Sequence, residues 1–149
     1  FLKYVHDIDI SFMKEDKIMR NELENLDMEK FIFTNGSAEH AQNILTRLGI
    51  YDLFGKEKVF DIKDAGYVPK PEAQTFDLMV KKFGINPKET IYIEDIAKNL
   101  STGFEKGCTT VWLINDEHFG KIDSDKDYIS HKIENLSLFL KEIRLLKSK

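Results

Sequence analysis

Short apolar runs alternate along the chain with longer stretches in which apolar residues recur at helical spacing. The helical stretches cover residues 15–26, 38–48, 71–83, 99–106 and 136–146. The short runs, which favour strands, cover residues 31–33, 59–60, 90–93 and 109–114. Ser37 is placed to cap the second helix, and Gly49 and Gly84 are placed to end the second and third helices. The pattern therefore predicts strands and helices in alternation, with a polar loop over residues 116–127.

Strands that alternate with helices of this length form βαβ units, in which neighbouring strands run parallel. We therefore expect an α/β fold with a parallel sheet flanked by helices. A length of 149 residues fits one domain with a single core. Ligands of such sheets bind at the carboxyl ends of the strands, so the polar residues that follow the apolar runs are the first candidates for function.

Charge, apolar runs and cysteine content argue against several classes of protein. The net charge of -4 gives no basic surface for nucleic acid, although small phosphorylated ligands depend on local charge and are not excluded. No apolar run approaches the length needed to span a bilayer, so no membrane partner is expected. Cys108 is the only cysteine, which excludes an intramolecular disulfide and fits a cytoplasmic protein. The oligomeric state is not readable from the sequence.

Two polar segments are candidates for binding phosphate. Thr34-Asn35-Gly36 follows the predicted strand at 31–33, and a hydroxyl with backbone amides at a strand-to-helix turn binds phosphate oxygens. The same residues would also serve as an ordinary helix cap with a turn glycine. Lys70 lies between two prolines, so its charge is held in place and would neutralise a phosphoryl group and an attacking carboxylate. A solvated lysine in a stiff loop is the alternative interpretation.

Adjacent carboxylates, Glu94-Asp95, follow the predicted strand at 90–93. Two neighbouring acids repel each other and resist burial. A hard cation such as Mg²⁺, which prefers oxygen ligands, would relieve that cost. A solvent-exposed acidic loop is the alternative. The order of the three polar clusters, each near the end of a strand, carries more information than any one of them.

In this order and spacing, the clusters resemble the motifs of the haloacid dehalogenase (HAD) superfamily of hydrolases. The matching segments are Phe31–Ser37 for the second motif, Lys70–Ala73 for the third, Ile91–Asp95 with Asn99 for the fourth, and Gly107–Trp112 for the next strand. The resemblance covers residues 14–115, and the stretch around His40 and Gly49 is most similar to the pyrimidine 5′-nucleotidase-like branch. It implies a Rossmann-like core.

The resemblance also implies a function and a role for each matching position. It implies a Mg²⁺-dependent phosphomonoester hydrolase that acts on a small phosphorylated substrate through an aspartyl-phosphate, with a nucleoside 5′-monophosphate as one candidate substrate. Thr34 and Lys70 would be the catalytic residues present, and Glu94 and Asp95 would bind Mg²⁺. The residues implied in substrate binding are Thr34, Asn35, Gly36 and Lys70. Asn99 would support the metal-binding loop.

The nucleophile that the family carries in an Asp-x-Asp motif has no good counterpart. Asp7 and Asp9 have the spacing, but the residues before them match a buried strand poorly, and too few residues follow them to hold a cap domain. We therefore expect a chain that lacks the first central strand and most of the cap. Residues 1–13 would be the remnant of that cap and residues 14–149 the core domain. The gap would be closed by direct strand pairing or by another segment, or would leave the chain marginally stable.

Two other functions remain open at this point. A fragment or degenerate member of the family would bind phosphate or Mg²⁺ without turnover, and it shares every residue named above. A receiver-like signalling module would also use an acidic pair, a threonine and a lysine, but its acidic pair precedes the other two. Among the remaining residues, Cys108 is expected in the core, and Asp61 and Asp64 are expected to be solvated loop acids.

Overall fold

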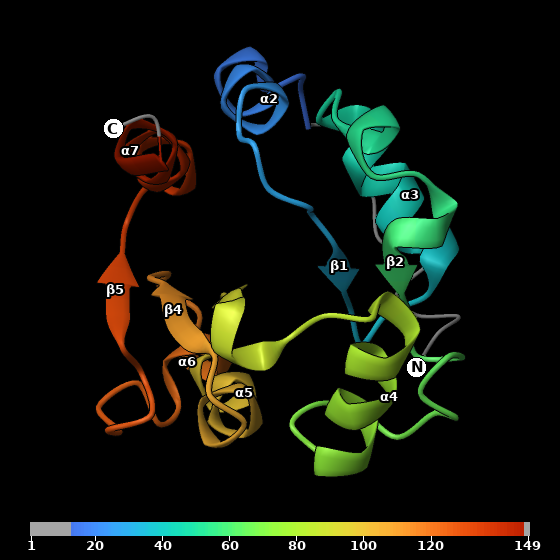
Figure 1. Ribbon diagram of the computed structural model, residues 1–149, viewed down its shortest axis with the longest axis vertical. Helices are drawn as coiled ribbons and strands as arrows, with labels where there is room; N and C mark the ends of the chain where they lie inside the picture. The colour runs from blue at the N-terminus through green and yellow to red at the C-terminus, as the bar shows by residue number, and fades with distance from the viewer. Residues whose placement is uncertain (1–12, 148–149) are drawn as a thin grey trace. The chain divides into compact units, whose positions relative to one another are not determined.

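The computed structural model describes residues 13–147. They divide into two compact units, which are described one at a time. The first unit contains the described residues up to Tyr67 together with those from Ser137 onward, and the second contains Val68–Leu136. Figure 1 labels most of the helices and strands of both. Asp7 and Asp9 lie outside the described residues, as does nearly all of the predicted cap remnant.

The first unit is built on a two-stranded parallel sheet. Its elements are α2 (Lys17–Glu24), β1 (Ile32–Phe33), α3 (Ala38–Arg47), the 3₁₀ helices η1 (Tyr51–Leu53) and η2 (Lys56–Lys58), β2 (Val59–Phe60) and α7 (Leu136–Lys147). Ile32 lies opposite Val59, and Phe33 lies opposite Phe60. The connection between the two strands passes through α3, which is the predicted βαβ arrangement. The apolar core of this unit includes Leu23, Leu26, Ala41, Leu45, Ile50, Phe54, Val59 and Phe60.

Local signals set the start of α3. The Ser37 hydroxyl oxygen accepts a hydrogen bond from a main-chain N–H of the first turn, as predicted for an N-cap. Asp61 Oδ2 accepts a second one from the Ala38 N–H at 2.9 Å, and Asp61 Oδ1 accepts from the Asp64 N–H at 3.0 Å. Asp61 is only 5% exposed, so the expectation of a solvated acid is wrong for this residue. Its charge is instead satisfied by main-chain donors at a helix N-terminus.

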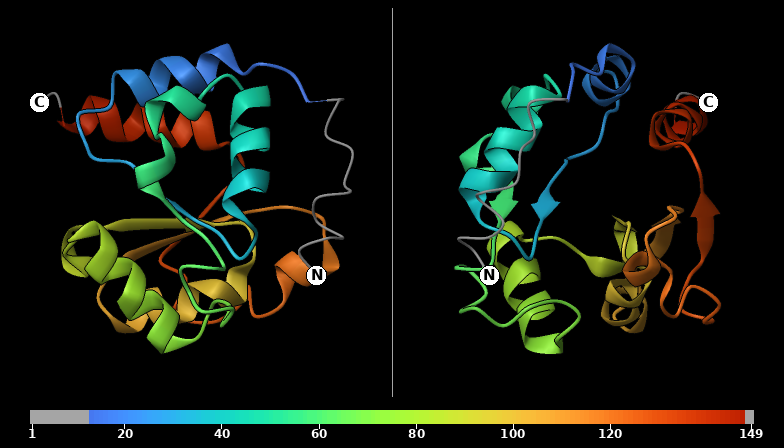
Figure 2. Two further views of the ribbon diagram at one scale, coloured as in Figure 1. Left: turned by 90° about the vertical axis from the view of Figure 1, so that its right-hand side faces the viewer. Right: turned by 180° about the vertical axis from the view of Figure 1, so that it is seen from behind.

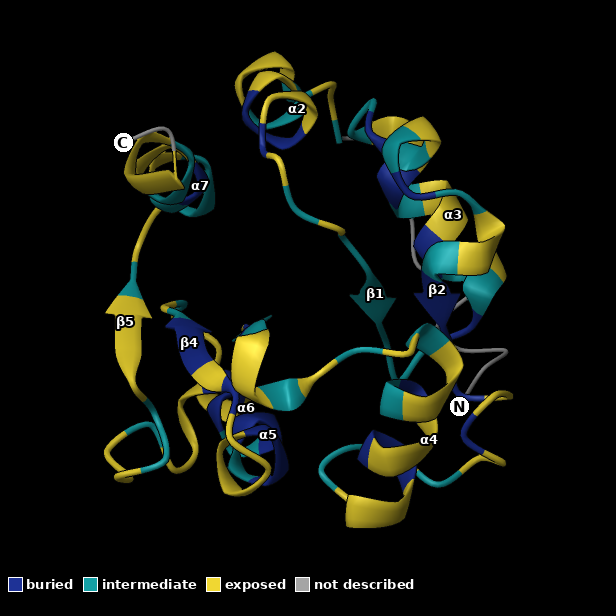
Figure 3. Cartoon of the chain, in the orientation of Figure 1, coloured by how far each residue is buried: buried dark blue, intermediate teal, exposed yellow. Residues whose placement is uncertain are grey.

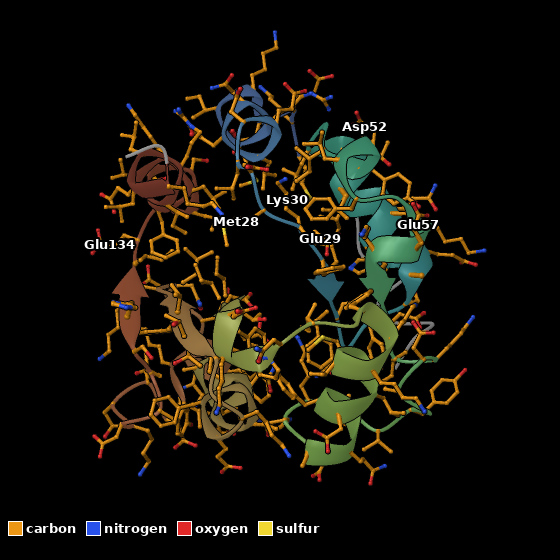
Figure 4. The ribbon with its side chains drawn as sticks, in the orientation of Figure 1. Met28, Glu29, Lys30, Asp52, Glu57 and Glu134 are labelled. Atoms are coloured by element: carbon orange, nitrogen blue, oxygen red, sulfur yellow. The ribbon has the colours of Figure 1, made fainter. Side chains whose placement is uncertain are left out.

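Two ion pairs hold α2 within the first unit. Arg144 Nε, on α7, donates to Glu22 Oε2 at 2.8 Å, and α2 and α7 lie side by side in Figure 2. This hydrogen bond lowers the pKa of Glu22, against the opposing effect of burial. Arg20 donates to both carboxylate oxygens of Asp52, which is labelled in Figure 4, at 2.7 and 2.8 Å. The amphipathic N-terminal helix is thereby fixed to segments that are distant in sequence.

The second unit is built on a three-stranded parallel sheet in the order β3-β4-β5. Its elements are α4 (Ala73–Phe83), η3 (Pro87–Glu89), β3 (Ile91–Glu94), η4 (Ala97–Leu100), α5 (Ser101–Glu105), β4 (Thr109–Leu113), α6 (His118–Lys121) and β5 (His131–Ile133). Its apolar core includes Phe76, Met79, Tyr92, Ala97, Leu100, Cys108, Val111 and Trp112. The expectation that Cys108 is a core residue is confirmed, and burial raises the pKa of its thiol to about 11.

Three features of the second unit differ from the sequence prediction. α6 lies inside the stretch predicted as a loop, and β5 falls where no strand was predicted. Figure 3 shows why β5 gave no apolar signal: its residues are mostly exposed, whereas those of β4, which has a neighbour on each side, are mostly buried. α4 begins at Ala73 and not at Pro71, because the Glu72 N–H donates to the Pro69 carbonyl and closes a turn first.

Parallel strands joined through helices confirm the predicted α/β class. Among residues 13–147, β1 pairs only with β2, and β3 pairs only with β4. That the gap is closed by direct strand pairing or by another segment stays a prediction. That the chain lacks a central strand, and that residues 14–149 form one core domain, stay predictions. None of the helices described here has the length and apolar character required to cross a membrane.

Candidate active site

A buried ion pair lies at the carboxyl end of β3. Lys70 Nζ donates to Glu94 Oε1 at 2.8 Å, and the two side chains are only 7% and 8% exposed. Lys70 lies in the turn before α4, and Glu94 is the last residue of β3. The structure thus joins two of the three predicted clusters within one unit. It does so at the strand end where parallel sheets bind their ligands.

Both oxygens of the Glu94 carboxylate are hydrogen bonded. Oε1 also accepts from Asn99 Nδ2 at 2.9 Å, and Oε2 accepts from the Asp95 N–H at 3.1 Å. Burial raises the pKa of Glu94, but Lys70 and the other donors outweigh it and bring the pKa below the ordinary value. Glu94 is therefore an ionised carboxylate that fixes the position of the Lys70 ammonium group.

Asp95 follows directly and lies at the surface. Partial burial raises the pKa of its carboxyl, and the neighbouring Glu94 carboxylate raises it further. A cation bound beside Asp95 would relieve this repulsion. Asn99 Oδ1 is a buried acceptor for which no hydrogen-bond partner is found among the described residues. These oxygen atoms are of the type that Mg²⁺ prefers.

The described part of the chain contains no cluster of three or more His, Cys, Asp or Glu side chains arranged to hold a metal ion. A cation at this position would therefore have few protein ligands. Mg²⁺ tolerates this better than Zn²⁺ or Ca²⁺, because it retains several water molecules and is often held by one or two carboxylates together with substrate phosphate. The residues present fit Mg²⁺ on these terms.

The predicted phosphate-binding turn lies in the first unit. Thr34 Oγ1 accepts from the Gly36 N–H at 2.9 Å, and the Thr34 N–H donates to the Phe60 carbonyl at 3.0 Å. The Gly36 carbonyl accepts from the Ile62 N–H. Both polar groups of Gly36 are thus used within this unit, and its contribution is to shape the turn. The Thr34 hydroxyl oxygen accepts from Gly36, and the hydroxyl proton can be donated to a ligand. Asn35 is the next residue in the turn.

The predicted site residues therefore fall into two groups, each described within its own unit. Lys70, Glu94 and Asp95 come together at the end of β3, whereas Thr34 and its neighbours form the turn after β1. Sequence reasoning missed two side chains that donate to the Asp95 carbonyl. They are those of Trp112, on β4, and Asn115, in the loop after β4. The strand pairing of β3 with β4 brings them close, and no local sequence signal marks them.

The chain is similar to known proteins both in a family-model match and in a pairwise sequence match. The model of the haloacid dehalogenase-like hydrolase family matches residues 19–104. A glyceraldehyde 3-phosphate phosphatase of Methanocaldococcus jannaschii is 26% identical over 127 residues, which are 85% of this chain and 54% of that protein. The chain therefore spans about half the length of this curated relative.

Two solved structures share the fold. A HAD family hydrolase from Deinococcus radiodurans R1, with bound phosphate and sodium, has a TM-score of 0.66 at 19% identity, covering 87% of this chain and 56% of that one. An L-2-haloacid dehalogenase from Xanthobacter autotrophicus has a TM-score of 0.65 at 16% identity, covering 84% and 59% respectively. At these identities the two structures support the Rossmann-like core and do not decide between phosphate and halide chemistry.

Proposed function

Because this chain belongs to the haloacid dehalogenase-like hydrolase family, we propose that it carries part of the active site of a Mg²⁺-dependent phosphomonoester hydrolase. The observation that carries the proposal is the buried Lys70–Glu94 pair beside the Asp95 carboxyl at the end of β3. A lysine held in this way is a fixed positive charge in a poorly solvated place. Such charges stabilise the transition state of phosphoryl transfer without reorganising during the reaction.

Each residue has a distinct role in the proposal. Lys70 faces the negative charge of the phosphoryl group and of the attacking carboxylate. Asp95 holds Mg²⁺, directly or through water. Glu94, the other predicted metal ligand, acts on the cation through its charge, since its oxygens already bind Lys70, Asn99 and the Asp95 amide. When bound, Mg²⁺ would neutralise charge on the phosphoryl oxygens.

The turn after β1, in the first unit, is proposed to bind phosphate. The Thr34 hydroxyl donates to a phosphoryl oxygen, and the Asn35 main chain binds a second one. Gly36 keeps the turn in shape, since its own N–H is bonded to Thr34 Oγ1 at 2.9 Å. Among substrates, a small phosphomonoester is favoured, because the phosphatase relative is named for glyceraldehyde 3-phosphate. A nucleoside 5′-monophosphate is the second substrate to test.

In the proposed reaction an aspartate attacks phosphorus, the P–O ester bond breaks and the substrate leaves as an alcohol, and water then hydrolyses the aspartyl-phosphate to phosphate and the free aspartate. Asp7 has the required spacing to a second aspartate, Asp9, but we propose that neither acts. A cytoplasmic location is part of the same proposal. It rests on Cys108 being the only cysteine in the sequence.

The test is phosphate release from glyceraldehyde 3-phosphate, a pyrimidine nucleoside 5′-monophosphate and an aryl phosphate, with Mg²⁺ or with a chelator. The unaltered chain is compared with Asp7→Asn and Lys70→Met, after circular dichroism has shown that each variant is folded. We expect Lys70→Met to lower any turnover by about 100-fold, as removal of one fixed transition-state charge or donor does.

Asp7→Asn separates the alternatives. The proposal assigns no role to Asp7, so this substitution should leave the result unchanged. A chain without turnover fits it, and so does turnover that survives Asp7→Asn and is lost in the chelator. Activity that Asp7→Asn abolishes makes Asp7 the nucleophile and overturns that part of it. A folded chain that binds Mg²⁺ but releases no phosphate from any substrate fits a domain that binds without turnover.

A further inference from the structure

The main chain of Asp95 is held by side chains at both of its polar groups. Its carbonyl oxygen accepts from the Trp112 indole N–H at 2.9 Å and from Asn115 Nδ2 at 2.8 Å. Its N–H donates to Glu94 Oε2 at 3.1 Å. Trp112 reaches it because it lies opposite Glu94 in the parallel β3–β4 pair. Since peptide groups are planar, these bonds hold the backbone on both sides of the Asp95 Cα and so fix the direction of its Cα–Cβ bond.

Asn115 is itself held in one orientation. Its Nδ2 also donates to the Leu113 carbonyl at 3.1 Å, and its Oδ1 accepts from the Glu117 N–H at 3.1 Å. The partners decide which end of the amide is which, because two carbonyl oxygens require the NH₂ group and an N–H requires the oxygen. Asn115 thus links the Asp95 carbonyl to the loop that leads into α6.

Gly120 lets the α6 main chain rest directly on this contact. A Cβ at this position would meet Asn115 Oδ1 at 2.6 Å and the Asp95 carbonyl oxygen at 2.9 Å. Any larger residue would have to displace one or both. The ammonium of Lys98 lies over the ring of Phe119, 4.1 Å from its centroid, and this contact joins α6 to η4.

We propose that Asn115, backed by Gly120, is a positioning residue that holds the Asp95 carboxylate ready to bind Mg²⁺. The inference rests on the proposed function, because it concerns the same metal site. Asn115 does not touch the cation or the substrate. It acts through the main chain of Asp95, so it determines how much ordering the carboxylate must undergo when the cation binds.

Residues that orient a metal ligand typically change metal affinity by about 10-fold to 100-fold when they are removed. For Asn115→Ala we expect the Mg²⁺ dissociation constant to rise by about 10-fold or more. Any turnover at saturating Mg²⁺ should fall by no more than about twofold, because the same carboxylate is in place once the cation has bound. This split between affinity and turnover distinguishes positioning from a general loss of structure.

The experiment is a Mg²⁺ titration followed by the fluorescence of Trp112, the only tryptophan, and by calorimetry. Trp112 is a suitable reporter, since its indole N–H is bonded to the residue proposed to hold the cation. Asn86→Ala is the matched control. It removes another asparagine from the same unit, whose side chain caps η3 through the Lys88 N–H. Gly120→Ala is a second test variant should Asn115→Ala fail to fold.

Weaker Mg²⁺ binding in Asn115→Ala or Gly120→Ala, with Asn86→Ala equal to the unaltered chain, supports the inference. Equal binding in the unaltered chain and in a folded Asn115→Ala overturns it and leaves the proposed function standing. If the unaltered chain gives neither a fluorescence change nor heat with Mg²⁺, the proposed metal site itself is wrong. The two failures are therefore told apart by the unaltered chain alone.

Discussion

Replacing Lys70 by methionine removes an ammonium group from a buried ion pair and leaves most of the side-chain volume in place. Lys70 and Glu94 are 7% and 8% exposed, so water cannot readily solvate the carboxylate that remains. The loss of one partner of a buried pair costs about 3–5 kcal/mol. Glu94 keeps its hydrogen bonds from Asn99 and from the Asp95 amide, so we expect about 3 kcal/mol.

The double variant Lys70→Met with Glu94→Gln tests whether this cost comes from the unpaired charge. With both charges removed, we expect most of the stability to return, leaving a loss of about 1 kcal/mol. The assay is urea unfolding followed by the fluorescence of Trp112, which lies on β4 opposite Glu94. Its signal therefore reports on the strand pair that carries the ion pair.

Lys106→Met is the matched control. Lys106 pairs with Asp77 at 3.3 Å, but the side chains are 39% and 60% exposed, and removing such a pair costs about 0.5 kcal/mol or less. A cost for Lys70→Met as small as that for Lys106→Met would mean that the unpaired Glu94 carboxylate does not destabilise the fold. So would simple additivity of the two single substitutions in the double variant.

Three further predictions concern packing, capping and pH. Gly103→Ala should destabilise the second unit by about 1–2 kcal/mol in urea unfolding, because its Cβ would meet the Tyr92 ring at 2.5 Å, which outweighs the gain in helix propensity. Asp61→Ala should lower stability by about 1–2 kcal/mol, measured by circular dichroism, since it removes an acceptor from the first turn of α3. Arg144 lowers the pKa of Glu22, so this pair stabilises the fold above the ordinary glutamate pKa, and the stabilisation should vanish as pH falls through the lowered value. Glu22→Gln should remove this part of the pH dependence in denaturation series.

Each of these has an outcome that would count against it. A Gly103→Ala variant as stable as the unaltered chain would mean that the ring has room to move. An Asp61→Ala variant with full stability would mean that water replaces the carboxylate at the cap. Identical pH dependence in the unaltered chain and Glu22→Gln would mean that the ion pair to α7 contributes nothing to folding.

Local signals allowed most elements to be predicted. α3 begins at Ala38, after the capping hydroxyl of Ser37, and the turn glycine Gly49 follows it in a left-handed conformation, with φ of +76°. β4 was predicted from its β-branched and aromatic residues, which are buried because strands flank it on both sides. Such features depend on neighbours in sequence, so the sequence carries them directly.

Features that depend on distant partners could not be predicted in this way. Asp61 looks like a loop acid until α3 places the Ala38 N–H against it. Glu94 looks like a metal ligand until the turn before α4 brings Lys70 to 2.8 Å from it. β5 is an exposed edge strand with no apolar alternation, and pairing with β4 alone defines it. In each case the feature depends on a contact with a residue that is distant in sequence, which no local pattern shows.

The measurement that tests the metal site most directly is the affinity for Mg²⁺, measured by calorimetry on the unaltered protein and on Asp95→Asn. Asp116→Asn, which removes an equivalent charge from an exposed loop, is the control. We expect Mg²⁺ binding that is unchanged in Asp116→Asn and is lost or much weaker in Asp95→Asn. Equal Mg²⁺ affinity in Asp95→Asn and the unaltered protein, or no binding by the unaltered protein, would show that Asp95 does not hold the cation.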